Sequence, residues 1–195
     1  MRSPHEIEIK LKVERPCALK QQLKECGFVV VERRHFESNI VLDFPDSRLR
    51  RSRSLLRLRT EGRRHILTYK GPPQASETYK IRTEIETGIE DADVLQQIFE
   101  ALALRPIFRY EKYRTAYAEK GWRKAGSRPL LVYDETPIGL YLELEGPARW
   151  IDGTARRLGY GKEDYITASY AALYLDYCRE NGIKPRNMVF SGDNS

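Results

Sequence analysis

The sequence lacks long hydrophobic runs. No stretch approaches the roughly 18 apolar residues of a membrane-spanning helix, and residues 1–5 lack the basic and then apolar pattern of a secretory signal. We therefore expect a soluble, cytoplasmic protein with no membrane partner. Its 195 residues and 41% hydrophobic content suit a single domain with a sizeable core. We expect this domain over 1–183 and a C-terminal tail over 184–195.

Cysteine and histidine are scarce, and neither has the spacing of a disulfide framework or a zinc site. The cysteines are odd in number, far apart and outside any Cys-x-x-Cys pattern: Cys17, Cys26 and Cys178. The histidines show no ligand spacing either: His5, His35 and His65. These patterns predict reduced thiols and histidines in surface or strand positions.

The chain also lacks the Gly-x-x-x-x-Gly-Lys-Ser/Thr loop that cradles phosphates at a helix start. Lysine and arginine nevertheless outnumber aspartate and glutamate by 34 to 28, which gives a net charge of +6 and a pI near 9.2. A basic balance favours anionic partners, so any bound phosphate would have to be held by side chains. Charge alone does not separate a nucleic acid from a nucleotide.

Polar and apolar residues alternate along much of the chain, as in half-buried strands. We expect strands over 5–13, 28–33, 36–44, 55–59, 63–70, 79–87, 107–119, 130–135 and 139–145. Helices are expected from Pro16 to Gly27, from the capping residue Asp91 to Leu104, and from Glu163 to Asn181. A basic loop is expected over 48–53, a turn over 121–128 and a loosely held end over 184–195. Strands in hairpin order predict an antiparallel barrel or curled sheet with helices outside, in the α+β class.

Charged residues recur two apart in these strands, and side chains two apart share a face of a strand. Glu6, Glu8, Lys10 and Lys12 face one way, while Ile7, Ile9, Leu11 and Val13 face the other. The same parity joins the following sets: Arg57 with Arg59; Lys80, Arg82, Glu84 and Glu86; Lys112 with Arg114; Glu143 with Glu145.

A solvent-facing side of a sheet explains any single such strand at least as well as a charged interior. Repetition over several strands, with almost no serine, threonine or amide mixed in, favours the interior. Uncompensated charge there costs several kcal/mol per ion, so the pattern predicts a charged ligand. Arginine and lysine suit phosphate oxygens, and paired carboxylates suit Mg²⁺ or Mn²⁺.

The segment Glu6-x-Glu8-x-Lys10 resembles the N-terminal signature of the CYTH superfamily, the triphosphate tunnel metalloenzymes that include class IV adenylyl cyclases and thiamine triphosphatases. Further motifs carry the resemblance in the same order: Leu56-Arg57-Leu58-Arg59, Thr68-Tyr69-Lys70-Gly71, Arg82-Thr83-Glu84-Ile85-Glu86, Lys112-Tyr113-Arg114, Asp134 and Glu143-Leu144-Glu145. The resemblance covers roughly residues 5–178. It implies a closed barrel of eight antiparallel strands, with helices packed on the outside.

The resemblance also implies roles for individual residues. Metal ligands or their close support would be Glu6, Glu8, Asp134, Glu143 and Glu145. The triphosphate would be gripped by Lys10, Arg57, Arg59, Lys70, Arg82, Lys112 and Arg114, with Lys10, Arg59, Lys112 and Arg114 as the catalytic residues. Lys80 and Arg82 could join either set, and Glu84 and Glu86 would orient the basic residues.

One segment departs from the family pattern. Some triphosphatases of the family place a lysine on the final helix to close over the phosphate. The segment Ile166–Tyr170 contains none, which makes the nearby Lys162 the candidate substitute.

These observations predict hydrolysis of a triphosphate with Mg²⁺ or Mn²⁺, the substrate being inorganic triphosphate, a nucleoside triphosphate or thiamine triphosphate. The alternative is a class IV adenylyl cyclase that converts ATP to cyclic AMP and pyrophosphate. Hydrolysis is preferred because cyclisation also needs an adenine pocket, whose residues the sequence does not identify. A noncatalytic module that binds RNA or polyphosphate through 48–64 is a lesser alternative. We do not expect nucleic acid as the partner, and a homodimer is compatible with the sequence.

Overall fold

The alternating segments pair into a closed antiparallel barrel in the order β1-β5-β4-β3-β2-β6-β7-β8, with β8 pairing back onto β1. The computed structural model describes residues 5–76, 78–122 and 129–191. The strands are β1 (His5–Lys12), β2 (Phe28–Asp43), β3 (Leu55–Glu61), β4 (Arg64–Lys70), β5 (Lys80–Ile89), β6 (Arg105–Glu119), β7 (Leu130–Thr136) and β8 (Gly139–Glu145). The predicted eight-stranded α+β fold is confirmed.

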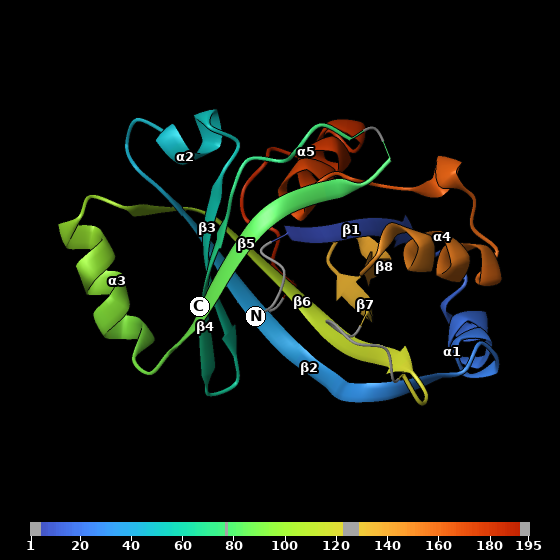
Figure 1. Cartoon of the computed structure of the whole chain (residues 1–195). Helices are drawn as coiled ribbons and strands as arrows, with labels where there is room; N and C mark the ends of the chain where they lie inside the picture. The colour runs from blue at the N-terminus through green and yellow to red at the C-terminus, as the bar shows by residue number, and fades with distance from the viewer. Residues whose placement is uncertain (1–4, 77, 123–128, 192–195) are drawn as a thin grey trace.

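Helices surround the barrel (Figure 1). They are α1 (Pro16–Glu25), α2 (Arg48–Arg51), α3 (Ala92–Ala101), α4 (Ala148–Arg157) and α5 (Tyr170–Glu180), with a short 3-10 helix η1 at Lys162–Asp164. Figure 1 shows α1 and α4 together on one side and α3 on the opposite side. No helix in the described ranges combines the length and apolar character that crossing a membrane requires.

The apolar faces of the strands point outward, and helices cover much of them. On β1 and β8, Ile9 and Leu142 are fully buried against Leu23 of α1 and Ile151 of α4. Burying one such side chain contributes about 1.5–3 kcal/mol. Because side chains alternate along a strand, this outward packing turns the charged set of each strand toward the barrel interior.

One part of the interior is aromatic rather than charged. Tyr110 and Tyr141 share a face with the inner residues of their neighbouring strands, and they pack against Tyr170 and Tyr174 of α5. The Tyr141 and Tyr170 rings meet edge to face with centroids 5.6 Å apart. Helix α5 therefore packs against the inner face of the barrel rather than on its outside.

Several sequence-based boundaries were wrong. The strands expected over 28–33 and 36–44 form one strand, β2, whose register against β6 shifts between Val30 and His35. The expected basic loop contains α2, where the carboxylate of Asp43 accepts hydrogen bonds from the backbone N–H groups of Leu49 and Arg50 at 3.0 and 2.9 Å. Helix α4 was not predicted.

The final helix begins at Tyr170 rather than at Glu163, because the Ser169 hydroxyl caps it by accepting from the Ala172 N–H. The C-terminal segment is also better anchored than expected. Met188 is fully buried, and its backbone pairs with β6 at Arg109 and Glu111. Within the turn expected over 121–128, residues 123–128 lie outside the described residues.

Candidate active site

The predicted site residues share the inner face of the barrel. Arg114 lies opposite Asp134 in the β6–β7 pairing, and Lys10 lies opposite Glu143 in the β1–β8 pairing. Cross-strand partners point to the same side of a sheet. This face carries the whole predicted set: Glu6, Glu8, Lys10, Arg57, Arg59, Lys70, Arg82, Lys112, Arg114, Asp134, Glu143 and Glu145.

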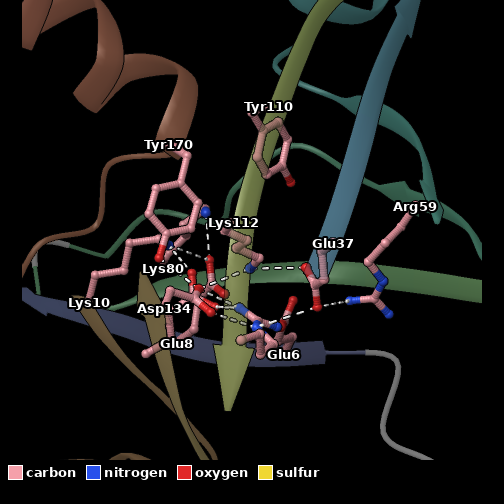
Figure 2. A network of polar contacts seen from close by, with 12 residues as sticks. Glu6, Glu8, Lys10, Glu37, Arg59, Lys80, Tyr110, Lys112, Asp134 and Tyr170 are labelled. Carbon is pink, nitrogen blue, oxygen red and sulfur yellow. Dashed lines mark hydrogen bonds and ion pairs between the residues drawn. The ribbon is translucent and has the colours of Figure 1, made fainter. Parts of the chain in front are cut away.

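Asp134 holds two of the basic residues in place (Figure 2). It is fully buried and accepts four hydrogen bonds: from the Lys112 ammonium at 2.9 Å, twice from the Arg114 guanidinium at 2.7 Å, and from the Tyr170 hydroxyl at 2.8 Å. Both of its oxygens are therefore engaged with donors. A role as metal ligand stays a prediction for Asp134, whereas its contacts describe a residue that orients two cations.

Lys10 is buried between two carboxylates, with its Nζ 3.1 Å from Glu143 and 3.6 Å from Glu8. Burial alone would lower the pKa of Lys10, but these carboxylates raise it above the ordinary lysine value. Burial likewise opposes ionisation of Glu143, yet Lys10 and Arg114 hold the pKa of Glu143 below its usual range. Both groups are therefore charged at neutral pH.

A second group of contacts lies along β4 and β5. The Lys70 ammonium contacts Glu6 at 2.7 Å and Glu84 at 2.8 Å. Lys80 donates to Glu8 at 2.5 Å. Arg82 differs, because its guanidinium donates to a backbone carbonyl, that of Arg53, and no ion pair forms on it within the described ranges.

Arg57 of β3 is held by polar groups of β4, β5 and β6. Arg57 donates to the Tyr110 hydroxyl at 3.2 Å and to Thr68 at 3.1 Å. Thr68 in turn donates to Glu86 at 2.7 Å, and Glu86 lies 3.5 Å from Arg57. Glu84 and Glu86 thus contact basic residues, as the predicted orienting role requires.

Sequence reasoning missed Glu37 of β2. This fully buried carboxylate lies 3.4 Å from Lys112, 3.7 Å from Arg114 and 3.9 Å from Arg59 (Figure 2). Burial would raise the pKa of Glu37, but Lys112 and Arg114 hold it well below the usual range. The alternation of side chains could have placed Glu37 on the inner face, because it lies on the face of its strand opposite Phe36 and Ile40. Its nearest neighbours on that face within the expected strand, Asn39 and Val41, are uncharged, so Glu37 did not stand out.

Glu37 also belongs to a cluster with His35 and Glu61, whose candidate ligand atoms all lie within 4.8 Å of one another. The Arg59 Nε lies 2.8 Å from the Glu61 carboxylate. A guanidinium therefore already supplies the positive charge at this cluster.

Comparison with known proteins identifies the family. The family model for the CYTH domain matches residues 4–170. The chain belongs to the CYTH domain family. It is 32% identical over 140 residues to a Methanocaldococcus jannaschii protein named "putative adenylate cyclase", covering 72% of this chain and 75% of that one.

Solved structures share this CYTH fold. A "putative adenylate cyclase" from Vibrio parahaemolyticus matches with a TM-score of 0.71 at 21% identity, covering 85% of this chain and 94% of that one. A "putative adenylyl cyclase" from Hippeastrum, described as having a dominant triphosphatase activity, matches with a TM-score of 0.58 at 19% identity, covering 92% and 97%. At these identities the likeness concerns the fold.

Carboxylates of β1, β5 and β8 crowd together on the inner face of the barrel. Glu8 lies opposite Glu145 across β1 and β8. Burial, and then the neighbouring Glu6, raise the pKa of Glu84 to about 8 and that of Glu145 to about 7, although part of Glu145 is open to solvent. Carboxylates that resist ionisation beside one another fit a hard divalent cation, which prefers oxygen ligands.

An aromatic residue of the final helix lies over two of the basic residues. Tyr170, the first residue of α5, lies with its ring 5.2 Å from the Lys10 Nζ and 5.3 Å from the Lys112 Nζ. Lys162, the expected substitute, is largely exposed and pairs with Asp152 of α4 at 3.5 Å. In this structure Lys162 does not make the closing contact.

Proposed function

We propose that this CYTH protein is a divalent-metal-dependent triphosphatase that acts on inorganic triphosphate, a nucleoside triphosphate or thiamine triphosphate. The observation that carries the proposal is the set of buried, fixed cations on one inner face, centred on Lys10, Lys112 and Arg114. Their carboxylate partners, Asp134 and Glu143, hold them with short hydrogen bonds and ion pairs. A site whose cations are fixed before the substrate arrives needs little reorganisation during reaction.

These residues suit the charge that develops in phosphoryl transfer. Arg59 and Arg114 offer planar forks of N–H donors that match phosphate oxygens two at a time. Lys10 and Lys112 supply compact charges beside them, while Arg57 and Lys70 can neutralise the remaining phosphates. The chain's contribution is to position the substrate and to stabilise negative charge as the terminal phosphate leaves.

Charge balance supports the metal requirement. Almost every inner cation already contacts a carboxylate, as Lys70 does with Glu6 and Glu84. A triphosphate would have to compete with these carboxylates. Mg²⁺ or Mn²⁺ held by the set Glu6, Glu8 and Glu145 would add positive charge and polarise phosphate oxygens. Lys70 and Lys80 would then be free to bind the substrate.

Adenylyl cyclase activity is the second candidate, and the name of the Methanocaldococcus jannaschii relative favours it. In that reaction the same cations would bind the triphosphate of ATP, and the ribose 3′-hydroxyl would attack the α-phosphorus. Hydrolysis asks less of the protein, because it needs only the phosphate site and water. The Hippeastrum protein is consistent with hydrolysis in a barrel of this fold.

The test is to incubate the purified protein with ATP, and separately with inorganic triphosphate, in the presence of Mg²⁺ or Mn²⁺. Chromatography then resolves phosphate, ADP, pyrophosphate and cyclic AMP. We expect phosphate without cyclic AMP. Cyclic AMP together with pyrophosphate would instead establish the cyclase.

Binding without turnover would favour the noncatalytic module. The double variant Glu8→Gln, Glu145→Gln separates the two cases. It should abolish turnover in an enzyme, but it should leave polyphosphate binding intact or stronger in a module that needs no metal.

A further inference from the structure

The carboxylate of Asp152 on α4 lies outside the barrel and joins two segments that are distant in sequence. Its Oδ1 atom accepts a hydrogen bond from the Tyr79 hydroxyl at 2.7 Å and another from the Tyr165 hydroxyl at 3.0 Å. The two tyrosine rings lie together with centroids 6.3 Å apart, and both pack against the hydrophobic cluster that includes Ile151 of α4. One oxygen atom therefore fixes the start of β5 and the segment between η1 and α5 relative to α4.

The protonation states of this group strengthen its hydrogen bonds. Burial opposes ionisation of Asp152, but the hydroxyls of Tyr79 and Tyr165 hold the pKa of Asp152 below its usual value. Burial, and then Asp152, raise the pKa of Tyr79 to about 12, so this hydroxyl stays protonated and donates. A hydrogen bond to an ionised acceptor is roughly twice as strong as one between neutral groups.

Each tyrosine precedes a residue that belongs to the candidate active site or pairs with it. Lys80 directly follows Tyr79. Neighbouring side chains of a strand point to opposite faces, so fixing Tyr79 against α4 also fixes Lys80 on the inner face. Ile166 directly follows Tyr165, and its backbone pairs with that of Lys10. The Lys10 N–H donates to the Ile166 carbonyl at 2.8 Å, and the Ile166 N–H donates to the Lys10 carbonyl at 2.9 Å.

The two lysines meet at one carboxylate oxygen. Lys80 donates to Oε1 of Glu8 at 2.5 Å, and the Lys10 Nζ lies 3.6 Å from the same atom. We propose that Asp152 is a positioning residue for the proposed reaction. From outside the barrel it holds Lys10 and Lys80 in place around Glu8. The effect on turnover rests on the proposed function, whereas the structural coupling does not.

The ion pair between Asp152 and Lys162 is not the contact that couples α4 to the site. Lys162 lies 3.5 Å from the other carboxylate oxygen, Oδ2, and its side chain is 64% exposed. Exposed ion pairs contribute little to stability. Lys162→Ala is therefore the matched control, because it removes a partner of the same carboxylate and leaves both tyrosine contacts intact.

Amide hydrogen exchange tests the coupling without reference to turnover. Asp152→Ala should raise the exchange rates of the Lys10 and Ile166 amides at least about tenfold, because the segment between η1 and α5 is released locally. The Leu104 amide donates to the Phe99 carbonyl at the end of α3, on the side of the molecule opposite α4 (Figure 1). It should exchange as in the wild type. Unchanged exchange at Lys10 and Ile166 would overturn the proposal, as would an equal acceleration at Leu104.

Turnover of inorganic triphosphate tests the consequence for the site. Asp152→Ala should lower kcat about 10- to 100-fold, the range that a small misplacement of active-site groups costs. Asp152→Asn keeps an acceptor oxygen for both hydroxyls and should retain most of kcat, as should Lys162→Ala. Asp152→Ala combined with Lys80→Ala should lose less than the product of the two single losses, because both changes act on one contact.

Three outcomes of these assays are decisive. If Asp152→Asn loses as much kcat as Asp152→Ala, the tyrosine contacts are not the cause, and the proposal fails. Fully multiplicative losses with Lys80→Ala would also overturn it. A wild-type protein without turnover would contradict the proposed function alone, since hydrogen exchange would still decide whether Asp152 fixes the Lys10 backbone.

Discussion

The hydroxyl of Tyr170 is the one neutral donor among the four hydrogen bonds to Asp134. Removing it leaves the carboxylate less firmly held and loosens Lys112 and Arg114. A hydrogen bond to a charged group contributes about 1.5–3 kcal/mol, so Tyr170→Phe should lower kcat about tenfold or more. Steady-state hydrolysis of inorganic triphosphate measures this.

Tyr174→Phe is the control for this variant, since the Tyr174 hydroxyl accepts from the backbone of Arg186 in the C-terminal segment. It should retain the wild-type kcat. Equal losses in the two variants would indicate that α5 acts through packing alone.

Arg59 and Arg64 lie on the same face of adjacent strands but differ in burial. Arg59 is nearly buried on the inner face, whereas Arg64 is 69% exposed. Removal of one preorganised donor to a developing negative charge costs about 10²–10³ in rate. Arg59→Ala should therefore lose about 100-fold in kcat/KM, and Arg64→Ala should lose little. An unchanged kcat/KM in Arg59→Ala would remove this residue from the phosphate grip.

His35 makes stability depend on pH. The Glu37 carboxylate, opposed in part by burial and assisted by the Arg33 carbonyl, raises the pKa of His35 to about 8. Since this lies above the unfolded value of about 6.5, the stabilisation is fully present below pH 6.5 and is lost as pH rises through 8. His35→Gln should therefore cost about 1 kcal/mol at pH 6 and nearly nothing at pH 9, measured by urea unfolding.

His65, whose ring contacts Thr60, supplies the control. The free-energy difference between wild type and His65→Gln should vary less between the two pH values. A pH-independent difference for His35→Gln would show that the His35–Glu37 contact carries no charge.

The alternation of side chains along each strand was sufficient to place the predicted residues on one face. Once the apolar side chains of a strand point outward, its charged side chains must point toward the barrel interior. It could not say what each residue touches. Asp134 was predicted to be a metal ligand from resemblance, yet its contacts depend on Tyr170, a residue 36 positions away. Contacts of that kind arise from packing between elements and have no local pattern.

At the scale of elements, the C-terminal segment acts as a short extra strand. The Met188 N–H donates to the Arg109 carbonyl at 3.0 Å, and its carbonyl accepts from Glu111 at 2.9 Å. The Met188 side chain packs in the same cluster as Tyr110 and Tyr174. Truncating a buried methionine costs about 2–5 kcal/mol.

Met188→Ala should therefore lower the free energy of unfolding by that amount, measured with urea. Ile183→Ala is the matched control because Ile183 is 47% exposed, and it should cost under 0.5 kcal/mol, roughly the effect of a surface substitution. If the two variants lose equal stability, Met188 does not anchor the segment.

Helices with strong end signals were predictable and the others were not. Pro16 at the start of α1 and Asp91 capping α3 are local features, and both helices were found. Helix α4 begins after Pro147 without a side-chain cap. Its buried residues, Ile151 and Ala155, are spaced as in an amphipathic helix, but the segment contains Gly153 and has no side-chain cap to mark its start.

At the scale of the whole molecule, the balance of charges in the barrel predicts that metal and substrate bind together. Triphosphate at a hundredfold excess over its Kd should stabilise the protein by about 2.7 kcal/mol, or roughly 5–10 °C in Tm for this chain length. We expect this shift only with Mg²⁺ or Mn²⁺ present. Differential scanning calorimetry with each ligand alone and with both provides the measurement. A full shift with triphosphate alone would contradict the metal requirement.

The closure of the barrel also has a consequence for how the chain folds. Strand β1 is the first made, yet its two neighbours are β5 and β8, which end at Ile89 and Glu145. Contacts so distant in sequence form slowly, because long loops must close before any pairing stabilises them. During synthesis β1 should therefore remain without a partner on one edge until β8 has emerged, with Ile9 and Leu11 open to aggregation.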